Sequence, residues 1–293
     1  ELLEQATGLA PEFAPAWAEM GLMHLKSASL LSASSDISAA YKEARNALQK
    51  ALDLDPDLAE ALSRMAFVRS DLDWDFAAAE RATERALAVA PNNPIVIGNA
   101  ANLYSTLGRL DESIEMNERL SETDPFNLTN YQNLGLTYNL AGRFDEAEAI
   151  WERGLKLEPD HLGILINLGV FKLKQGDIDG GRADLARAVE LLGNESNWKL
   201  SFDALSEHYA GNSAKADALM LEFEKKYCDS QPTTCALLDA TRGRVDETFA
   251  WLEKAYAIRD PLLPSYKTDP DIAKLRDDPR WSSFWQKVGF PAE

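Results

Sequence analysis

Apolar residues recur along the chain with the spacing of amphipathic helices, in stretches that prolines interrupt. The segments ALDLDP and ALAVAP end in Pro56 and Pro91, and SETDP and LKLEP end in Pro125 and Pro159. Because proline cannot continue a helix, each segment is typical of a helix end followed by a turn. The last two of these prolines each lie 34 residues after the one before. A fixed period of this length predicts an array of repeated helical units.

Glycines mark the middle of the units. They stand where the first helix of a unit should end and the second begin, at Gly108, Gly142, Gly176, Gly211 and Gly243. A helix often ends in a left-handed residue, and glycine adopts that conformation without strain. Each unit is therefore predicted to be a pair of antiparallel helices.

The residues within the units resemble the tetratricopeptide family, which places bulky and small residues at fixed offsets on both helices of a hairpin. Small residues let the two helices approach closely, and bulky ones fill the gap to the next hairpin. The resemblance implies an all-α fold, a right-handed superhelical solenoid of stacked antiparallel helix pairs. The clearest repeat carries Tyr131, Leu134, Gly135, Tyr138, Gly142, Ala147 and Pro159.

The spacing of the repeats divides the whole chain into predicted hairpins and flanking segments. Residues 1–13 are expected to finish a truncated preceding repeat, and an insertion near 27–38 enlarges the first hairpin. The predicted order is five hairpins in 14–195 (14–58, 59–93, 94–127, 128–161 and 162–195), two degenerate hairpins in 196–260, and capping helices in 261–293.

Two short helices are predicted near the C-terminus. Asp269 and Asp278 are each followed by proline, which is typical of an N-cap with proline at the first helical position. The second helix should carry an apolar face that covers the open end of the final repeat, made of Trp281, Phe284, Trp285 and Val288.

Several segments are similar to one bacterial group of tetratricopeptide proteins. They are DWDFAAAERATERAL (73–87), LEKAYAIRDP (252–261), LRDDPRW (275–281) and GFP (289–291). In that group the repeats form the C-terminal part of multidomain proteins, after a nucleotidyl cyclase, a winged-helix transcription-regulator or a protein kinase domain. The resemblance implies a regulatory segment of a larger signalling protein. The chain also opens without an initiator methionine inside a helical pattern, so we expect a piece of something longer.

Charge narrows the classes of partner. The chain carries 48 acidic and 30 basic residues, a formal net charge of −18. Such a surface repels phosphate backbones and anionic lipid headgroups, so a neutral or basic polypeptide is the expected partner and nucleic acid is not. The alternative that the acidic surface only keeps the solenoid soluble stays open. No apolar stretch reaches the roughly 18 residues of a membrane span, so insertion into a membrane is not expected.

No motif for phosphate binding, dinucleotide binding, zinc hydrolysis or a serine nucleophile occurs in the sequence. The segments DLDPD (53–57) and DLDWD (71–75) imitate calcium loops, but Leu58 and Phe76 replace the required glycine. We therefore expect no cofactor, no metal and no catalytic residue in this chain. The three histidines are scattered over different hairpins, at His24, His161 and His208.

Two cysteines, Cys228 and Cys235, flank the polar turn DSQPTT. The pair can form a disulfide in an oxidising compartment and would remain two thiols in the cytosol. The sequence leaves the compartment open between cytoplasm and periplasm, and the pair favours the periplasmic side.

In tetratricopeptide arrays the first helix of each hairpin lines a concave groove. The corresponding positions here include Asn99, Asn133 and Asn167, which are spaced 34 apart. Asparagine amides can pair with the backbone of an extended ligand whatever its sequence, although they can equally bond between neighbouring helices. The predicted peptide groove consists of Arg64, Phe67, Asn99, Asn102, Gln132, Asn133, Leu136, Asn139, Asn167, Val170 and Lys174.

These observations favour a protein–protein interaction scaffold that binds a peptide or protein segment in the groove. The alternative is a structural or dimerising stalk of a cyclase-like or regulator-like protein, with an empty groove and contacts between two copies.

Overall fold

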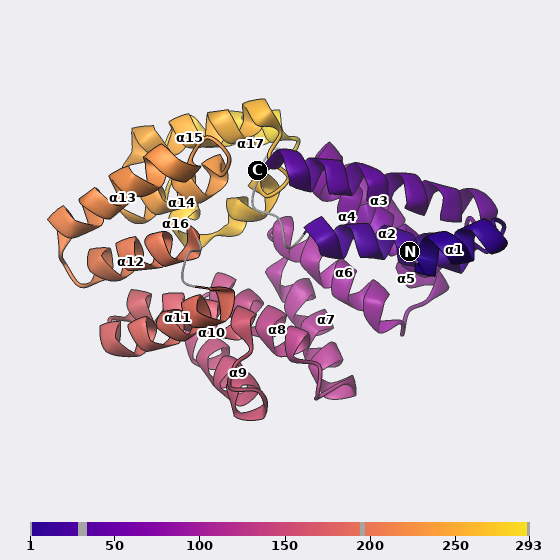
Figure 1. Ribbon diagram of the computed structural model, residues 1–293, viewed down its shortest axis with the longest axis horizontal. Helices are drawn as coiled ribbons and strands as arrows, with labels where there is room; N and C mark the ends of the chain where they lie inside the picture. The colour runs from indigo at the N-terminus through magenta and orange to yellow at the C-terminus, as the bar shows by residue number, and fades with distance from the viewer. Residues whose placement is uncertain (1, 29–33, 194–196, 292–293) are drawn as a thin grey trace.

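The computed structural model describes residues 2–28, 34–193 and 197–291. Within these ranges the regular structure is helical and contains no strand, which confirms the predicted all-α class. The helices stack into a curved solenoid (Figure 1).

Consecutive helices pack as antiparallel hairpins after a short first helix, α1 (Leu2–Leu9). Residues 29–33, part of the predicted insertion, lie outside the described residues, and the helix after them is the longest described. The hairpins are α2 (Ala14–Ala28) with α3 (Ser34–Leu54), α4 (Ala59–Val68) with α5 (Phe76–Val89), α6 (Pro94–Thr106) with α7 (Leu110–Thr123), α8 (Leu128–Leu140) with α9 (Phe144–Leu157), α10 (Leu162–Gln175) with α11 (Ile178–Leu192), α12 (Asn197–Tyr209) with α13 (Ser213–Tyr227), and α14 (Pro232–Thr241) with α15 (Val245–Ile258).

Local sequence explains where these helices begin and end. The side chains of Asn93, Asn127 and His161, spaced 34 apart, each accept a hydrogen bond from a backbone N–H in the first turn of α6, α8 and α10. Between α8 and α9 the chain turns at Gly142, whose φ of +74° is left-handed with open space around it. Glycine stands there for its conformation alone.

Close approach between paired helices depends on small residues. A Cβ at Gly135 of α8 would lie 2.3 Å from the indole nitrogen of Trp151 on α9. That indole is buried, and its N–H donates to the carbonyl of Gln132 at 3.2 Å. The glycine therefore makes room for the largest side chain in this part of the core.

The C-terminal residues form a strap, defined here as residues 260–273, and a final helix, α17 (Trp281–Val288). The strap consists of the 3-10 helix η2 (Leu263–Thr268) and α16 (Pro270–Ala273). It packs against α6 and α14, and Asp271 forms an ion pair of 2.8 Å with Lys174 of α10. Because these are first helices of three different hairpins, the strap crosses the inner side of the curve (Figure 1).

The chain end also reaches the second hairpin. Trp281, Phe284, Trp285 and Val288 share one buried cluster with α15, and this cluster includes Trp74 and Phe76. The rings of Phe76 and Phe290 lie 4.2 Å apart between centroids. We call this contact the clasp; it consists of Trp74, Phe76, Arg259, Gly289 and Phe290.

Arg259 strengthens the clasp with polar contacts. Its guanidinium lies 4.6 Å from the centre of the Trp74 ring and donates to the carbonyl of Leu72 at 3.2 Å. Trp74 follows the π-helical turn η1 (Arg69–Asp73), and both Trp74 and Arg259 have a left-handed φ of 55°. Residues other than glycine keep this conformation only where their surroundings hold it, so the contact is tightly specified. The clasp joins the second hairpin to the C-terminal end of the solenoid.

Candidate functional site

The predicted groove residues near the N-terminus are engaged within the protein. Arg64 is 2% exposed, and its guanidinium donates to the carbonyl of Ala18 at 3.0 Å and to the carboxylate of Glu19 at 2.9 Å. It ties α4 to α2 and presents no free charge to a ligand. The Asn99 amide donates to the hydroxyl of Ser63 at 2.5 Å, a bond between neighbouring first helices.

Four further residues of the predicted groove do not share a common site. Phe67 packs edge-on against Tyr41, while Asn102 is exposed. The Gln132 side chain lies where a Cβ at Gly163 would be, so it fills the space against the next hairpin. Asn133 is partly buried and does not belong to the lining of the cavity formed by the remaining positions.

The other five predicted positions meet around one space, which we call the concave cavity. It has a volume of about 240 Å³ and is bounded by α8, α10, α12, α14 and η2. Apolar side chains of α12 and α14, including Trp198, Phe202 and Leu238, form the opposite wall. The predicted residues on its surface are Leu136, Asn139, Asn167, Val170 and Lys174.

Tyr266 and Asp269 of the strap complete the cavity. No pattern in the sequence predicts these two, because they lie far along the chain from α8 and α10 and reach the cavity only through the path of the strap. One Asp269 oxygen accepts hydrogen bonds from the backbone N–H groups of Asp271 at 2.8 Å and Ile272 at 3.3 Å, which caps α16. Burial raises the pKa of the Asp269 carboxyl, and the charge of Lys174 opposes this shift.

One buried polar atom among the described residues of the cavity lacks a hydrogen-bond partner. The side-chain N–H₂ of Asn167 is buried and makes no hydrogen bond in the structure. Such a donor costs about 1–3 kcal/mol when it is left unsatisfied. A ligand carbonyl beside Asn167 would remove that cost.

Comparison with known proteins identifies the repeats. Tetratricopeptide-repeat family models match residues 75–135 and 128–161. The chain carries tetratricopeptide repeats. No curated protein sequence matches it at a significant level.

Solved structures share the tetratricopeptide solenoid. PilF of Pseudomonas aeruginosa is 19% identical, with a TM-score of 0.55 over 73% of this chain and 91% of that one. PilW, a widely conserved type IV pilus biogenesis factor, is 17% identical, with a TM-score of 0.58 over 73% of this chain and 93% of that one. A tetratricopeptide protein of Parabacteroides merdae is 14% identical, with a TM-score of 0.57 over 84% of this chain and 99% of that one. At these identities the likeness establishes the fold.

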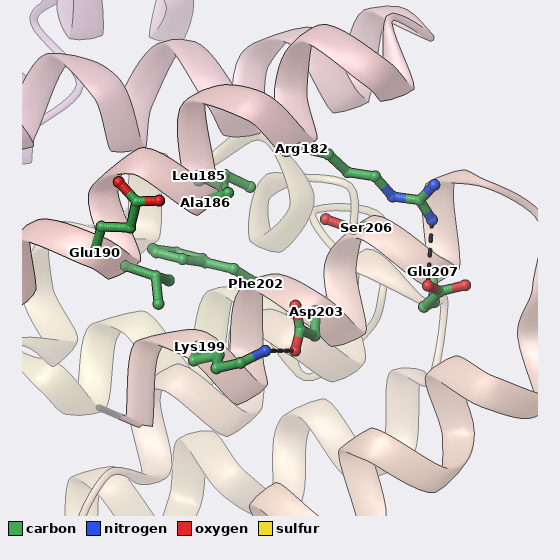
Figure 2. Close-up of a pocket in the computed structure, with 10 residues that line it drawn as sticks. Arg182, Leu185, Ala186, Glu190, Lys199, Phe202, Asp203, Ser206 and Glu207 are labelled. Atoms are coloured by element: carbon green, nitrogen blue, oxygen red, sulfur yellow. Dashed lines mark hydrogen bonds and ion pairs between the residues drawn. The ribbon is translucent and has the colours of Figure 1, made fainter. Parts of the chain in front are cut away.

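A second cavity, of about 340 Å³, lies between helices α11 and α12 (Figure 2). Figure 2 shows Leu185 and Phe202 on its apolar side and charged residues at its edges. The charges are paired with one another: Arg182 with Glu207 at 3.2 Å, and Lys199 with Asp203 at 2.5 Å. None of the described residues that line this cavity has a buried side-chain polar atom without a hydrogen-bond partner, in contrast to Asn167 at the concave cavity.

The part of the chain that the structure describes has no group of three or more His, Cys, Asp or Glu side chains placed to hold a metal ion. No described helix is both long and apolar enough to span a bilayer. Cys228 and Cys235, both buried, form a disulfide that joins the end of α13 to α14.

Proposed function

We propose that this chain is a protein-interaction module that binds a segment of another polypeptide at the concave cavity. The tetratricopeptide fold is consistent with a protein-binding scaffold. The observation that carries the proposal is the cavity itself, where apolar walls adjoin the unpartnered amide of Asn167. An apolar side chain of the partner would contact those walls while its backbone carbonyl accepts from Asn167.

The cavity's size supports a peptide over a cofactor. Pockets for small molecules usually measure about 300–1,000 Å³, and this one holds about 240 Å³. It has room for one anchoring side chain and part of its backbone. The net charge of −18 supports a neutral or basic partner. The sequence resemblance to bacterial regulators supports a regulatory role beside an effector domain.

The test begins with selection of peptides from a random display library on the purified chain, followed by calorimetry of one selected peptide. Leu136→Ala and Asn167→Ala should each weaken its binding about tenfold or more, because both side chains line the cavity. Leu136 is 38% exposed, so its truncation should leave the fold intact.

Matched controls lie away from the cavity. Leu221→Ala alters a leucine of α13 that is 51% exposed, and Asn102→Ala alters an exposed asparagine of α6. Both should bind as wild type does. Selected peptides that tolerate Leu136→Ala and Asn167→Ala alike would show that the partner binds elsewhere.

A further inference from the structure

The strap gives the concave cavity a charged group as well as a wall. Asp269 faces the cavity, and only one of its two carboxylate oxygens takes part in capping α16. No side chain in the described ranges forms an ion pair with it. Its second oxygen is therefore available to a ligand.

The nearby lysines do not neutralise Asp269 directly. Lys174 is directed to Asp271, whose carboxylate also accepts from the hydroxyl of Thr241 at 3.0 Å. Lys274 also binds Asp271, at 2.6 Å, but it is 67% exposed and is screened by solvent. Both Lys174 and Lys274 therefore form their ion pairs with Asp271 and not with Asp269.

The walls around Asp269 suit a long side chain with a charged end. Val170, Phe202 and Leu238 can cover methylene groups, while the rings of Trp198 and Tyr266 can lie beside a cation. Lysine and arginine combine an apolar stem with a cationic head, and a small apolar cavity with a carboxylate that forms no ion pair with a described side chain matches both parts.

We propose that the concave cavity is a specificity pocket for a basic side chain of the partner, whose cation pairs with Asp269 on the C-terminal strap. This inference rests on the proposed function and adds the chemical class of the anchor. It also makes the strap part of the binding site, since the strap supplies the charge while the repeats supply the apolar walls and the amide of Asn167.

The experiment uses two blocked five-residue peptides that differ only at the centre, with lysine in one and norleucine in the other between alanines. Norleucine has a similar unbranched stem without the charge. Ligand-observed NMR titrations of the intact chain give both affinities. Wild type should bind the lysine peptide about tenfold more tightly than the norleucine peptide, a difference of about 1.4 kcal/mol.

The decisive variant is Asp269→Asn. Asparagine caps a helix as well as aspartate does, so α16 keeps its cap while the charge is lost. The preference for lysine should disappear in this variant, with little change for the norleucine peptide. Lys274→Ala is the control, because it changes an exposed charge on the outer side of Asp271 and should keep the preference.

Equal affinity of wild type for the two peptides would overturn the basic anchor, as would a lysine preference that survives in Asp269→Asn. Failure of both peptides to bind, while library-selected peptides do bind, would also overturn it. The proposed function survives each of these results if a selected peptide still depends on Leu136 and Asn167. It fails separately if those substitutions have no effect.

Discussion

At the scale of single residues, similar side chains in one short segment take different roles. The segment DLDWD (71–75) imitates a calcium-binding loop in sequence, but in the structure each of its three aspartates has a different set of contacts. Asp75 caps α5 by accepting from the N–H of Ala78 at 2.9 Å, and Asp73 pairs with Arg45. Burial raises the pKa of Asp71 from 3.8 to about 7, beside the hydroxyls of Ser70 and Tyr41.

The raised pKa of Asp71 predicts a stability change with pH. Between pH 3.8 and about 7 the folded chain holds a proton on Asp71 that the unfolded chain has released. Folded-state stability should therefore fall as pH rises through this window and level off above it. Asp71→Asn removes this titration, so the stability of the variant relative to wild type should rise by about 4 kcal/mol between acid and neutral pH.

Urea unfolding at a series of pH values measures this difference. Asp111→Asn, at an exposed position on α7, is the control and should follow the wild-type profile. Parallel profiles for wild type and Asp71→Asn would contradict a buried, proton-binding carboxyl.

At the scale of elements, the hairpins follow local rules that the sequence displays. Asparagine and histidine caps begin α6, α8 and α10 at intervals of 34, and a left-handed glycine separates the helices of a pair. The seventh hairpin departs from this regularity. Its first helix, α14, begins without a side-chain cap, and it is joined to the preceding hairpin by the disulfide.

The disulfide between Cys228 and Cys235 should stabilise this hairpin. The cysteines are seven residues apart, and closing so short a loop restricts the unfolded chain by about 2–3 kcal/mol. Reductant, or replacement of both cysteines by alanine, should lower the free energy of unfolding by that amount. Urea unfolding with and without dithiothreitol measures it.

The double alanine variant is its own control, because reductant should not change its unfolding. A wild-type unfolding curve that is the same in reductant would mean that the bridge is not formed in solution.

At the scale of the whole molecule, the clasp closes the curve. Its five residues belong to segments whose sequences resemble one bacterial group of tetratricopeptide proteins, namely 73–87, 252–261 and 289–291. Gly289 shows how close the contact is, because a Cβ there would lie 2.6 Å from the carbonyl oxygen of Trp74. With the strap running from this contact past α6 to α10, the clasp fixes the position of Asp269 over the concave cavity.

Breaking the clasp should open the curve without melting the repeats. In Arg259→Ala combined with Phe290→Ala, the lost ring contact and guanidinium bonds should cost about 3–5 kcal/mol. The radius of gyration from small-angle X-ray scattering should increase, while the helical content by circular dichroism stays near wild type. The matched control is Arg85→Ala with Phe126→Ala, which removes the same residue types from exposed positions.

An unchanged scattering profile in the clasp variant, with the expected loss of stability, would show that the other contacts of the strap are enough to keep the ends together.

The sequence by itself determined the helices, their pairing and the solenoid, because caps, left-handed glycines and small residues act within one hairpin or between neighbours. It also named five residues that line the concave cavity, since their place in the repeat fixes which face of the helix they occupy. Only the tertiary structure decided which residues of other helices pack against that face. Arg64 and Asn99 form hydrogen bonds within the protein because adjacent helices place acceptors beside them. Tyr266, Asp269 and the clasp depend on contacts between segments far apart in the sequence, such as Phe76 with Phe290, which arise from the accumulated curvature of every hairpin between them.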